Sequence, residues 1–369
     1  MSLSPIPLPH GIQSRMVPHV NGLTMHVLEA GHETPGRPLL LLLHGFPELA
    51  YSWRHVMRPL AASGFHVVAP DLRGYGRTTG ADTRYDGDLA QFRQMNLTRD
   101  VVGLVHALGH KRVHAVVGHD FGSPVAAHAT LVRPDIFPAV ALMSAPFSGP
   151  PALRDGTPPP AQDIVAELAA IGRKHYHWYY STPEADTDMT GAPQGLPAFI
   201  RGYYHHKSAD WAENRPVPLT AWSAAELAKL PTYYVMNLHE DMAQTVAPHT
   251  PPQYSPWLTE EDVGFYAGEY ARTGFQGGLN WYRIRTSRRF DADMEAFTGR
   301  TIDVPSLFIA GASDWGIHQS PGALARMNGT ACTDMRGVHL VDGAGHWVQQ
   351  EQPEATTRLL LDFINTLPG

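Results

Sequence analysis

The chain has a single cysteine, Cys332, among its 369 residues. One thiol excludes an internal disulfide framework and a cysteine-rich metal site. Long hydrophobic runs are missing as well: the longest, Leu39–Leu43, has only the length of a strand, whereas a membrane-spanning helix needs about 18 apolar residues. The first residues also lack the positive and apolar segments of a secretory signal peptide. We therefore expect no membrane span and a cytoplasmic location.

Positive charge is in deficit, since 28 Lys and Arg residues against 35 Asp and Glu residues give a net charge of −7. This balance argues against nucleic acid as a partner. Metal-binding motifs are absent from the sequence too: there is no H-E-x-x-H, and the adjacent His205 and His206 would face different ways on a helix. We expect neither a metal nor an organic cofactor.

What the chain does have is a globular composition, with 43% hydrophobic and 17% charged residues. Its length exceeds that of one ordinary domain, so it holds either two modules or one core with a large insertion. Several short apolar runs are typical of strands buried on both faces of a parallel sheet. They are Leu39–Leu43, Val67–Ala69, Val113–Val117, Val140–Met143, Leu307–Ala310 and Val338–Val341.

Helical patterns lie between these runs. One is expected to begin with a cap at Asn96 and to end at Gly109, and the last begins at Pro353, a residue favoured in the first helical turn. Near the N-terminus, the alternating residues Leu23–Val27 predict a half-exposed antiparallel strand. Strands that alternate with helices predict an α/β protein with a doubly wound, mostly parallel sheet.

The alternation stops near Pro146 and resumes near Val304. The residues between are dense in Tyr, Trp, His and Pro, and their apolar period is helical where it is legible, as in Ile164–Ile171. We therefore expect one α/β core formed by residues 1–146 and 304–369. Residues 147–303, called the insert below, are expected to form a mainly helical lid between two core strands.

The most informative stretch is Gly118-His119-Asp120-Phe121-Gly122, which follows an apolar strand and precedes a helix. Two glycines around a central residue suit a sharp strand–turn–helix that leaves no room for Cβ atoms. This is the G-x-S-x-G nucleophile elbow with aspartate in place of serine. The structural alternative is that Asp120 merely caps the helix. At this motif the chain resembles the α/β-hydrolase superfamily, in the branch that uses an aspartate nucleophile.

An aspartate at the elbow predicts a particular chemistry. A serine that attacked an sp³ carbon would leave an ether, which water does not readily cleave. A carboxylate that attacks an sp³ carbon gives an alkyl ester, which water can hydrolyse at the carbonyl. Aspartate, whose carboxyl group ordinarily has a pKa of about 3.9, is ionised at neutral pH and needs no base for its attack. Asp120 therefore indicates alkyl transfer, as from epoxides or alkyl halides.

The turn His44-Gly45-Phe46-Pro47 ends the first buried run and extends the resemblance. In this superfamily such an H-G-x-P turn lines the site. The resemblance implies that the backbone N–H groups of Phe46 and Phe121 form an oxyanion hole for ester hydrolysis. The Phe46–Pro47 bond is a candidate for a cis peptide.

Two further strand ends supply the remaining groups that the resemblance implies. His346, in Gly343-Ala-Gly-His346-Trp347 after the last run, is expected to activate the hydrolytic water, and Asp314, after the preceding run, to orient it. The chain order Asp120, Asp314, His346 is that of the superfamily. His119 is adjacent to Asp120 and is expected to point away from the site.

The insert carries the resemblance to epoxide hydrolases, in which two lid tyrosines donate hydrogen bonds to the oxirane oxygen. Residues 274–283 closely resemble the segment that bears one of them, so Tyr282 is expected in that role. Residues 175–183 resemble the other segment, in which Tyr176 matches best and Tyr179 is the alternative. The residues expected to line the substrate pocket are His44, Pro47, Trp178, Tyr179, Tyr180, Trp281 and Trp347.

Three functions compete. The first is an epoxide hydrolase that acts on a small apolar epoxide and water. The second is a haloalkane or haloacid dehalogenase with the same triad, although Phe121 stands where haloalkane dehalogenases usually carry tryptophan. The third is a non-catalytic ligand-binding relative, against which the complete set of predicted catalytic residues argues. A homodimer is one of the assemblies that the sequence leaves open.

Overall fold

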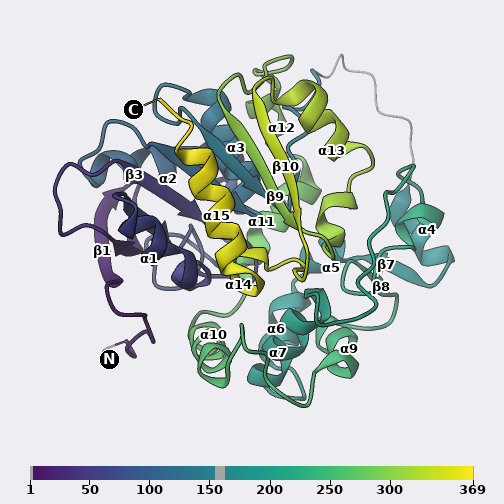
Figure 1. Ribbon diagram of the computed structural model, residues 1–369. Coiled ribbons are helices and arrows are strands. Elements are labelled where there is room, and N and C mark those ends of the chain that lie inside the picture. Colours follow the sequence, from purple (N-terminus) through teal and green to yellow (C-terminus); the bar gives the residue numbers. More distant parts are fainter. Residues whose placement is uncertain (1–2, 154–162, 369) are drawn as a thin grey trace.

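A computed structural model describes residues 3–153 and 163–368, so that positions 154–162 of the predicted insert lie outside the described residues. An eight-stranded sheet forms the centre of the molecule, in the order β1-β2-β4-β3-β5-β6-β9-β10 (Figure 1). Strands β1 and β2, and β2 and β4, pair antiparallel, and all other neighbours pair parallel. The strands are β1 (Gln13–Val20), β2 (Leu23–Ala30), β3 (Leu39–Leu43), β4 (His66–Pro70), β5 (Ala115–His119), β6 (Val140–Met143), β9 (Ser306–Gly311) and β10 (Met335–Val341).

Helices cover both faces of this sheet, so that β3, β5 and β6 are buried along their whole length. On one face, α1 and α15 pack over Leu40 and Leu42; on the other, α2 and α3 pack over Leu39, Leu41 and Leu43. The helices of the predicted core are α1 (Arg54–Ala62), α2 (Gln94–Ala107), α3 (Gly122–Val132), α13 (Ala323–Arg326), α14 (Val348–Glu351) and α15 (Pro353–Ile364). The mostly parallel, doubly wound α/β sheet predicted from the sequence is thus confirmed.

Two local expectations are wrong. Helix α2 begins at Gln94 with Arg93 as its N-cap, and Asn96 lies inside the first turn, where its amide donates to the carbonyl of Gln91. Strand β2 is buried rather than half-exposed, because β1 and β4 flank it and its polar side chains have partners. His26, for example, lies 2.7 Å from a carboxylate oxygen of Asp71. Strand β1 itself was not predicted.

The insert follows β6 and precedes β9. As expected, its described part is mainly helical, and it also contains a two-stranded sheet that was not predicted. Its elements are α4 (Ile164–Ala170), β7 (Arg173–His175), α5 (Tyr176–Tyr180), α6 (Glu184–Thr190), α7 (Leu196–Lys207), α8 (Ala224–Leu227), β8 (Val235–Asn237), α9 (Met242–Val246), α10 (Glu260–Thr273), α11 (Gln276–Ser287) and α12 (Asp291–Glu295).

The insert packs against the loops that leave the carboxyl ends of the core strands. The indole of Trp281 on α11 donates to the carbonyl of Arg73, after β4, and the hydroxyl of Tyr204 on α7 donates to the carbonyl of Pro47, after β3. A buried ion pair of 2.7 Å joins Arg77 to Glu269 on α10. Among the described residues, no helix is both long and apolar enough to cross a membrane.

Candidate active site

Strands β3 and β5 are neighbours in the sheet, but the chain leaves β3 toward β4 on one side and continues from β5 to β6 on the other. Such a switch point leaves a crevice at the carboxyl ends of the strands, where ligands bind in open α/β sheets. Phe46 follows β3, and Asp120 follows β5. The sheet topology therefore places the predicted oxyanion turn beside the predicted nucleophile.

Asp120 occupies the sharp turn between β5 and α3. Its backbone has a φ of 49°, a left-handed conformation that a non-glycine residue rarely adopts and that often marks a functional site. The flanking glycines permit this turn, since a Cβ on Gly118 would lie 2.1 Å from the carbonyl oxygen of Gly122, and one on Gly122 would lie 2.2 Å from that of Leu43. The turn thus has the tight geometry expected of a nucleophile elbow.

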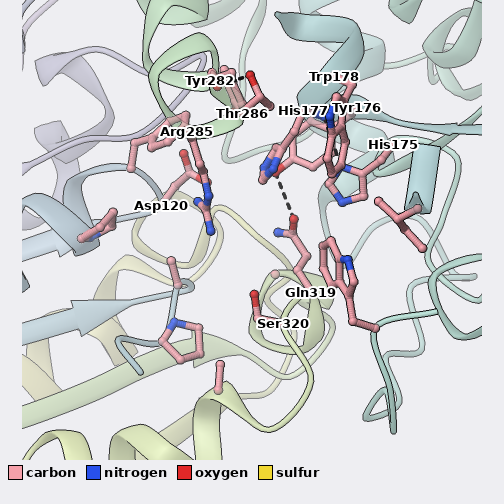
Figure 2. A pocket seen from close by; sticks show the side chains of 18 of the residues that line it. Asp120, His175, Tyr176, His177, Trp178, Tyr282, Arg285, Thr286, Gln319 and Ser320 are labelled. Carbon is pink, nitrogen blue, oxygen red and sulfur yellow. Dashed lines mark hydrogen bonds between the residues drawn. The ribbon is translucent and has the colours of Figure 1, made fainter. Parts of the chain in front are cut away.

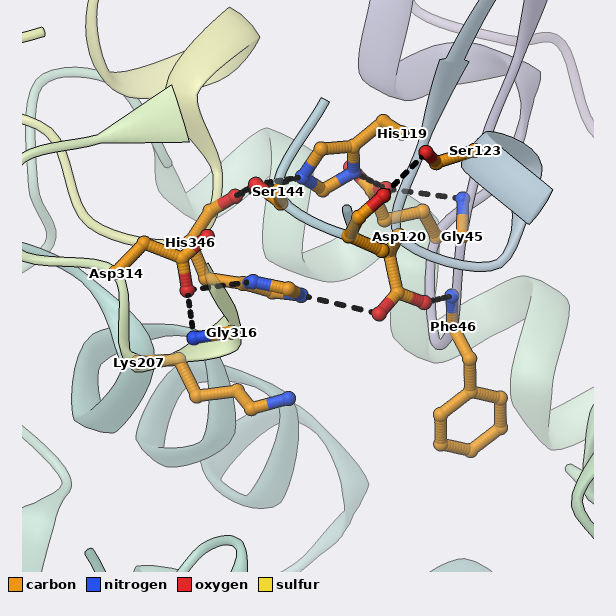
Figure 3. A network of polar contacts seen from close by, with 12 residues as sticks. Gly45, Phe46, His119, Asp120, Ser123, Ser144, Lys207, Asp314, Gly316 and His346 are labelled. Atoms are coloured by element: carbon orange, nitrogen blue, oxygen red, sulfur yellow. Dashed lines mark hydrogen bonds and ion pairs between the residues drawn. The ribbon is translucent and has the colours of Figure 1, made fainter. Parts of the chain in front are cut away.

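The two carboxylate oxygens of Asp120 have different surroundings (Figure 3). Oδ1 accepts a hydrogen bond of 2.9 Å from the N–H of Phe46, which precedes the cis bond to Pro47. Oδ2 lies 3.4 Å from Nε2 of His346. Phe121, the second predicted oxyanion donor, directly follows Asp120 at the N-terminal end of α3.

His346 and Asp314 come from loops after the last two strands. Nδ1 of His346 lies 3.1 Å from Oδ1 of Asp314, and both side chains are buried. The same Asp314 oxygen accepts a 2.7 Å hydrogen bond from the N–H of Gly316, at the start of the short 3-10 helix η4 (Trp315–His318). The structure therefore aligns Asp120, His346 and Asp314 in one row, as Figure 3 shows.

The charges in this row support one another. Burial favours protonated Asp120, but the nearby imidazole of His346 and the ammonium of Lys207 outweigh it and hold the pKa of Asp120 below its usual range. Burial favours neutral His346, yet Asp314 and Asp120 raise its pKa to about 9. In this state Asp120 is an ionised carboxylate beside an imidazolium.

A second buried pair lies behind the row. His119 does not line the cavity: its Nδ1 lies 2.6 Å from Oε2 of Glu48, and its Nε2 lies 2.7 Å from the backbone carbonyl of His346. The other carboxylate oxygen of Glu48 accepts from the side-chain amides of Gln349 and Gln350. This pair holds the loop of His346 against β5, a role for Glu48 that was not predicted.

A cavity of about 400 Å³ opens in front of Asp120 (Figure 2). Tyr176 from α5 and Tyr282 from α11 line it, and the rings of these tyrosines lie 5.6 Å apart between centroids. The hydroxyl of Tyr176 donates to the side-chain oxygen of Gln319 over 3.0 Å. Burial raises the pKa of both tyrosines well above the usual value, and the charge of Asp120 adds to this effect. Both hydroxyls are therefore protonated donors at neutral pH.

Of the residues expected to line the pocket, only Trp178 borders this cavity. Trp281 borders a neighbouring cavity of about 450 Å³ that shares Phe121 with the first. The polar groups of the others form hydrogen bonds within the protein. Nε2 of His44 accepts from the N–H of Leu72, and the carbonyl of Pro47 accepts from the hydroxyl of Tyr204. The side chains that donate are Tyr179 to Asp188, Tyr180 to Tyr203, and Trp347 to the carbonyl of Tyr204.

The cavity is more polar than the aromatic composition of the insert suggested. His175, His177, Arg285 and Gln319 line it together with the aromatic side chains. These polar residues and Lys207 were not predicted, because they stand in no recognisable motif and reach the site only through the packing of the insert. Among the residues that the structure describes, no group of His, Cys, Asp and Glu is arranged to hold a metal ion.

Comparisons with known proteins agree with this geometry. Residues 38–353 match a family model described as the alpha/beta hydrolase fold. Epoxide hydrolase A of Mycobacterium tuberculosis is 36% identical over 97% of this chain and 99% of its own length. Epoxide hydrolase 3 of Siraitia grosvenorii is 33% identical over 94% of this chain and 96% of its own.

Solved structures give the same result. An epoxide hydrolase from an endophytic Streptomyces superposes with a TM-score of 0.77 and 32% identity, and the match covers 97% of this chain and 96% of that one. Epoxide hydrolase I of potato superposes with a TM-score of 0.74 at 32% identity, over 96% of this chain and 100% of the other. The chain therefore belongs to the epoxide hydrolase family of α/β-hydrolase-fold proteins.

Proposed function

We propose that this protein is an epoxide hydrolase that converts epoxides to vicinal diols through an alkyl ester on Asp120. Its relatives support the activity, since they carry that name over nearly the full chain. The observation that carries the mechanism is the position of the Asp120 carboxylate. It lies between a backbone N–H and a His–Asp pair, and it borders a cavity that two protonated tyrosines also line.

In the first step, Oδ2 of Asp120 attacks an oxirane carbon while the ring C–O bond breaks. Oδ1 is the poorer nucleophile, because it accepts a hydrogen bond from the N–H of Phe46. The leaving oxygen gains negative charge, and the hydroxyls of Tyr176 and Tyr282 stabilise it and supply its proton. The products are a hydroxyalkyl ester on Asp120 and a lid tyrosine that has lost its hydroxyl proton.

In the second step, water attacks the ester carbonyl carbon of Asp120, and His346 takes the proton of that water. The negative charge on Oδ1 is stabilised by the N–H of Phe46 and, we infer, by that of Phe121. Collapse of the tetrahedral intermediate breaks the bond to the diol oxygen, which takes the second proton of the water, and restores the carboxylate. Asp314 orients the imidazole and stabilises the imidazolium.

We further propose that residues 147–303 act as the lid of a core formed by residues 1–146 and 304–369. The lid supplies the two tyrosines, and the core supplies the nucleophile and its partners. Between Tyr176 and Tyr179, the contacts favour Tyr176, because the hydroxyl of Tyr179 donates to Asp188 over 2.9 Å and accepts from the N–H of Met242.

The covalent route can be tested by one turnover in ¹⁸O-labelled water, with styrene oxide as the probe. We expect one ¹⁸O atom in the peptide that contains Asp120 and none in the diol from that first turnover. The variant His346→Gln is expected to retain the epoxide as an ester, visible as an increase in the intact mass, and Asp120→Ala to form no adduct. Label in the diol alone would show direct attack by water.

A further inference from the structure

Lys207, the last residue of α7, is a buried cation that the steps above do not use. Its exposed fraction is 2%, and within the described residues it forms no ion pair with a carboxylate. Its only side-chain hydrogen bond there is a long one of 3.4 Å to the hydroxyl of Tyr203. Buried lysines are rare unless they are paired, so the position of this one needs a reason.

Aromatic rings hold the ammonium in place. Nζ of Lys207 lies 4.6 Å from the ring centroid of Tyr234, 5.1 Å from that of Tyr203, 5.6 Å from that of Tyr233 and 5.7 Å from that of Trp347. The ring of the catalytic candidate Tyr176 is 5.9 Å away. Ring faces attract a cation without neutralising its charge. The field of Lys207 therefore reaches the neighbouring catalytic groups.

These groups lie on one side of Lys207. Figure 3 shows the lysine side chain running alongside the His346–Asp120 contact. Its backbone carbonyl accepts a 2.9 Å hydrogen bond from the N–H of His346, so that the lysine and the imidazole are fixed relative to each other. Burial lowers the pKa of Lys207 to about 8, while the carboxylates of Asp120, Asp314 and Glu48 favour the ammonium.

The charged groups that face His346 change during the proposed reaction. In the free enzyme, Asp120 and Asp314 favour the imidazolium, and Lys207 opposes it. The His119–Glu48 pair, whose histidine ring lies 5.1 Å from that of His346, is present throughout. Once Asp120 is esterified, its negative charge is gone, and the charges of Asp314 and Lys207 act on His346 in opposite directions.

We propose that Lys207 is a positioning residue for ester hydrolysis, whose caged ammonium drives the proton off His346 after Asp120 has been alkylated. The inference rests on the proposed function. Epoxide opening takes one proton from a lid tyrosine, and the imidazolium of His346 gives its proton to that tyrosine. Ester hydrolysis then releases one proton from water to His346. At a pH below its own pKa, Lys207 keeps its proton and acts only through its charge.

The test compares Lys207→Met, which keeps length and fits an aromatic cage, with Lys207→Arg, which keeps the charge. Single turnovers with styrene oxide are quenched at pH values from 5 to 9, and the alkylated and free enzyme are measured by intact mass. In Lys207→Met we expect the pH midpoint of ester hydrolysis to rise by about one unit, which slows hydrolysis about tenfold at the acidic end. Alkylation should change little, and Lys207→Arg should restore the midpoint.

Tyr203→Phe is the matched control, because it removes the hydrogen bond from Nζ, together with the one from Tyr180, but keeps the ring. Its pH midpoint should equal that of the wild type. If Lys207→Met slows hydrolysis equally at every pH, the lysine has only a structural role and the inference fails. If Lys207→Met does not fold, Lys207→Gln is measured in the same way. If the wild type forms no ester at all, it is the proposed function that fails.

Discussion

At the scale of single residues, one edge of the sheet gathers the groups of the candidate site. Asp120, Asp314 and His346 each follow a predicted strand, and parallel strands bring their carboxyl ends to one edge. Glu48 follows a strand in the same way. Its importance comes from Gln349 and Gln350, which are about three hundred positions away in the chain and which no local pattern connects to it.

Glu48 gives the first prediction at this scale. Its carboxylate accepts hydrogen bonds from the N–H of Gly45 and from the amides of Gln349 and Gln350, and it is fully buried beside His119. In Glu48→Gln, the amide NH₂ would face a donor in either orientation: the side-chain amides of Gln349 and Gln350 on one side, or the N–H of Gly45 on the other. We expect a loss of about 2–4 kcal/mol in the free energy of unfolding, because a buried carboxylate is removed from its partners and at least one buried donor is left unpaired.

Urea denaturation at pH 7, followed by tryptophan fluorescence, measures this loss. Glu226→Gln is a suitable control, because Glu226 accepts from Lys229 and from the N–H of Thr220 at the surface, where ion pairs contribute little. A loss in Glu48→Gln no greater than in the control would contradict the central role of Glu48.

At the scale of elements, the type of element was easier to predict than the direction of each side chain. The strand runs from Leu39 to Leu43 and from Val140 to Met143 were predicted to the residue, because continuous apolar runs define buried strands. Pocket residues were harder. Tyr282 lines the cavity while its neighbour Trp281 binds the core, because successive residues on a helix point about 100° apart.

Helix α11 provides a prediction at this scale, since it carries Tyr282 and approaches the core very closely. A Cβ on Gly277 would lie 1.9 Å from the carbonyl oxygen of Gly74, so either α11 or the turn that contains Gly74 would have to move. Gly277→Ala should therefore displace α11 and Tyr282. We expect kcat/KM for styrene oxide to fall at least about tenfold, since misplacement of about 1 Å is costly in catalysis.

The matched control is Gly264→Ala in α10, an exposed helical glycine with nothing within 4 Å of the added Cβ. Because alanine favours a helix over glycine, this variant should be as active as the wild type and about 0.5–1 kcal/mol more stable. Equal activity in both variants would show that the contact with Gly74 does not position α11.

At the scale of the whole molecule, length allowed either two modules or one core with an insertion, and the break in the alternation of strands and helices favoured the insertion. The polarity of the cavity was not predictable, because composition averages over the insert and does not say which side chains meet. Several histidines are also buried, which composition alone would place at the surface. His206 on α7 has no exposed surface, and its ring stacks on that of His249 at 3.6 Å between centroids.

Buried histidines make the stability of the whole molecule depend on pH. Burial, helped by nearby positive charge, lowers the pKa of His206 to about 2 and that of His175 to about 3. In the unfolded chain each takes up a proton near pH 6.5. Below that pH the unfolded state therefore binds more protons, and each group lowers the free energy of unfolding by up to about 1.4 kcal/mol per pH unit.

Other groups add to this slope or oppose it. Burial favours the protonated forms of Asp71 and Glu29, but their hydrogen-bonded partners outweigh it and lower the pKa of each to about 2. The two carboxylates therefore contribute to the free energy of unfolding at neutral pH, and this contribution is lost as the pH falls below about 4.5. Glu351 has the opposite sign, because burial raises its pKa to about 7 and the folded state then binds the extra proton between 4.5 and 7. Between pH 7 and pH 5, its effect on the free energy of unfolding is about equal and opposite to that of one buried histidine.

We therefore expect the protein to be less stable at pH 5 than at pH 7, as measured by urea denaturation at both values. In His206→Gln the loss between the two pH values should be smaller by about 1–2 kcal/mol, whatever the variant's stability at pH 7, because one proton no longer binds on unfolding. The difference between pH values is the readout, since a defect in packing alone would lower stability equally at both. A loss as large as that of the wild type would show that His206 can be protonated in the folded state.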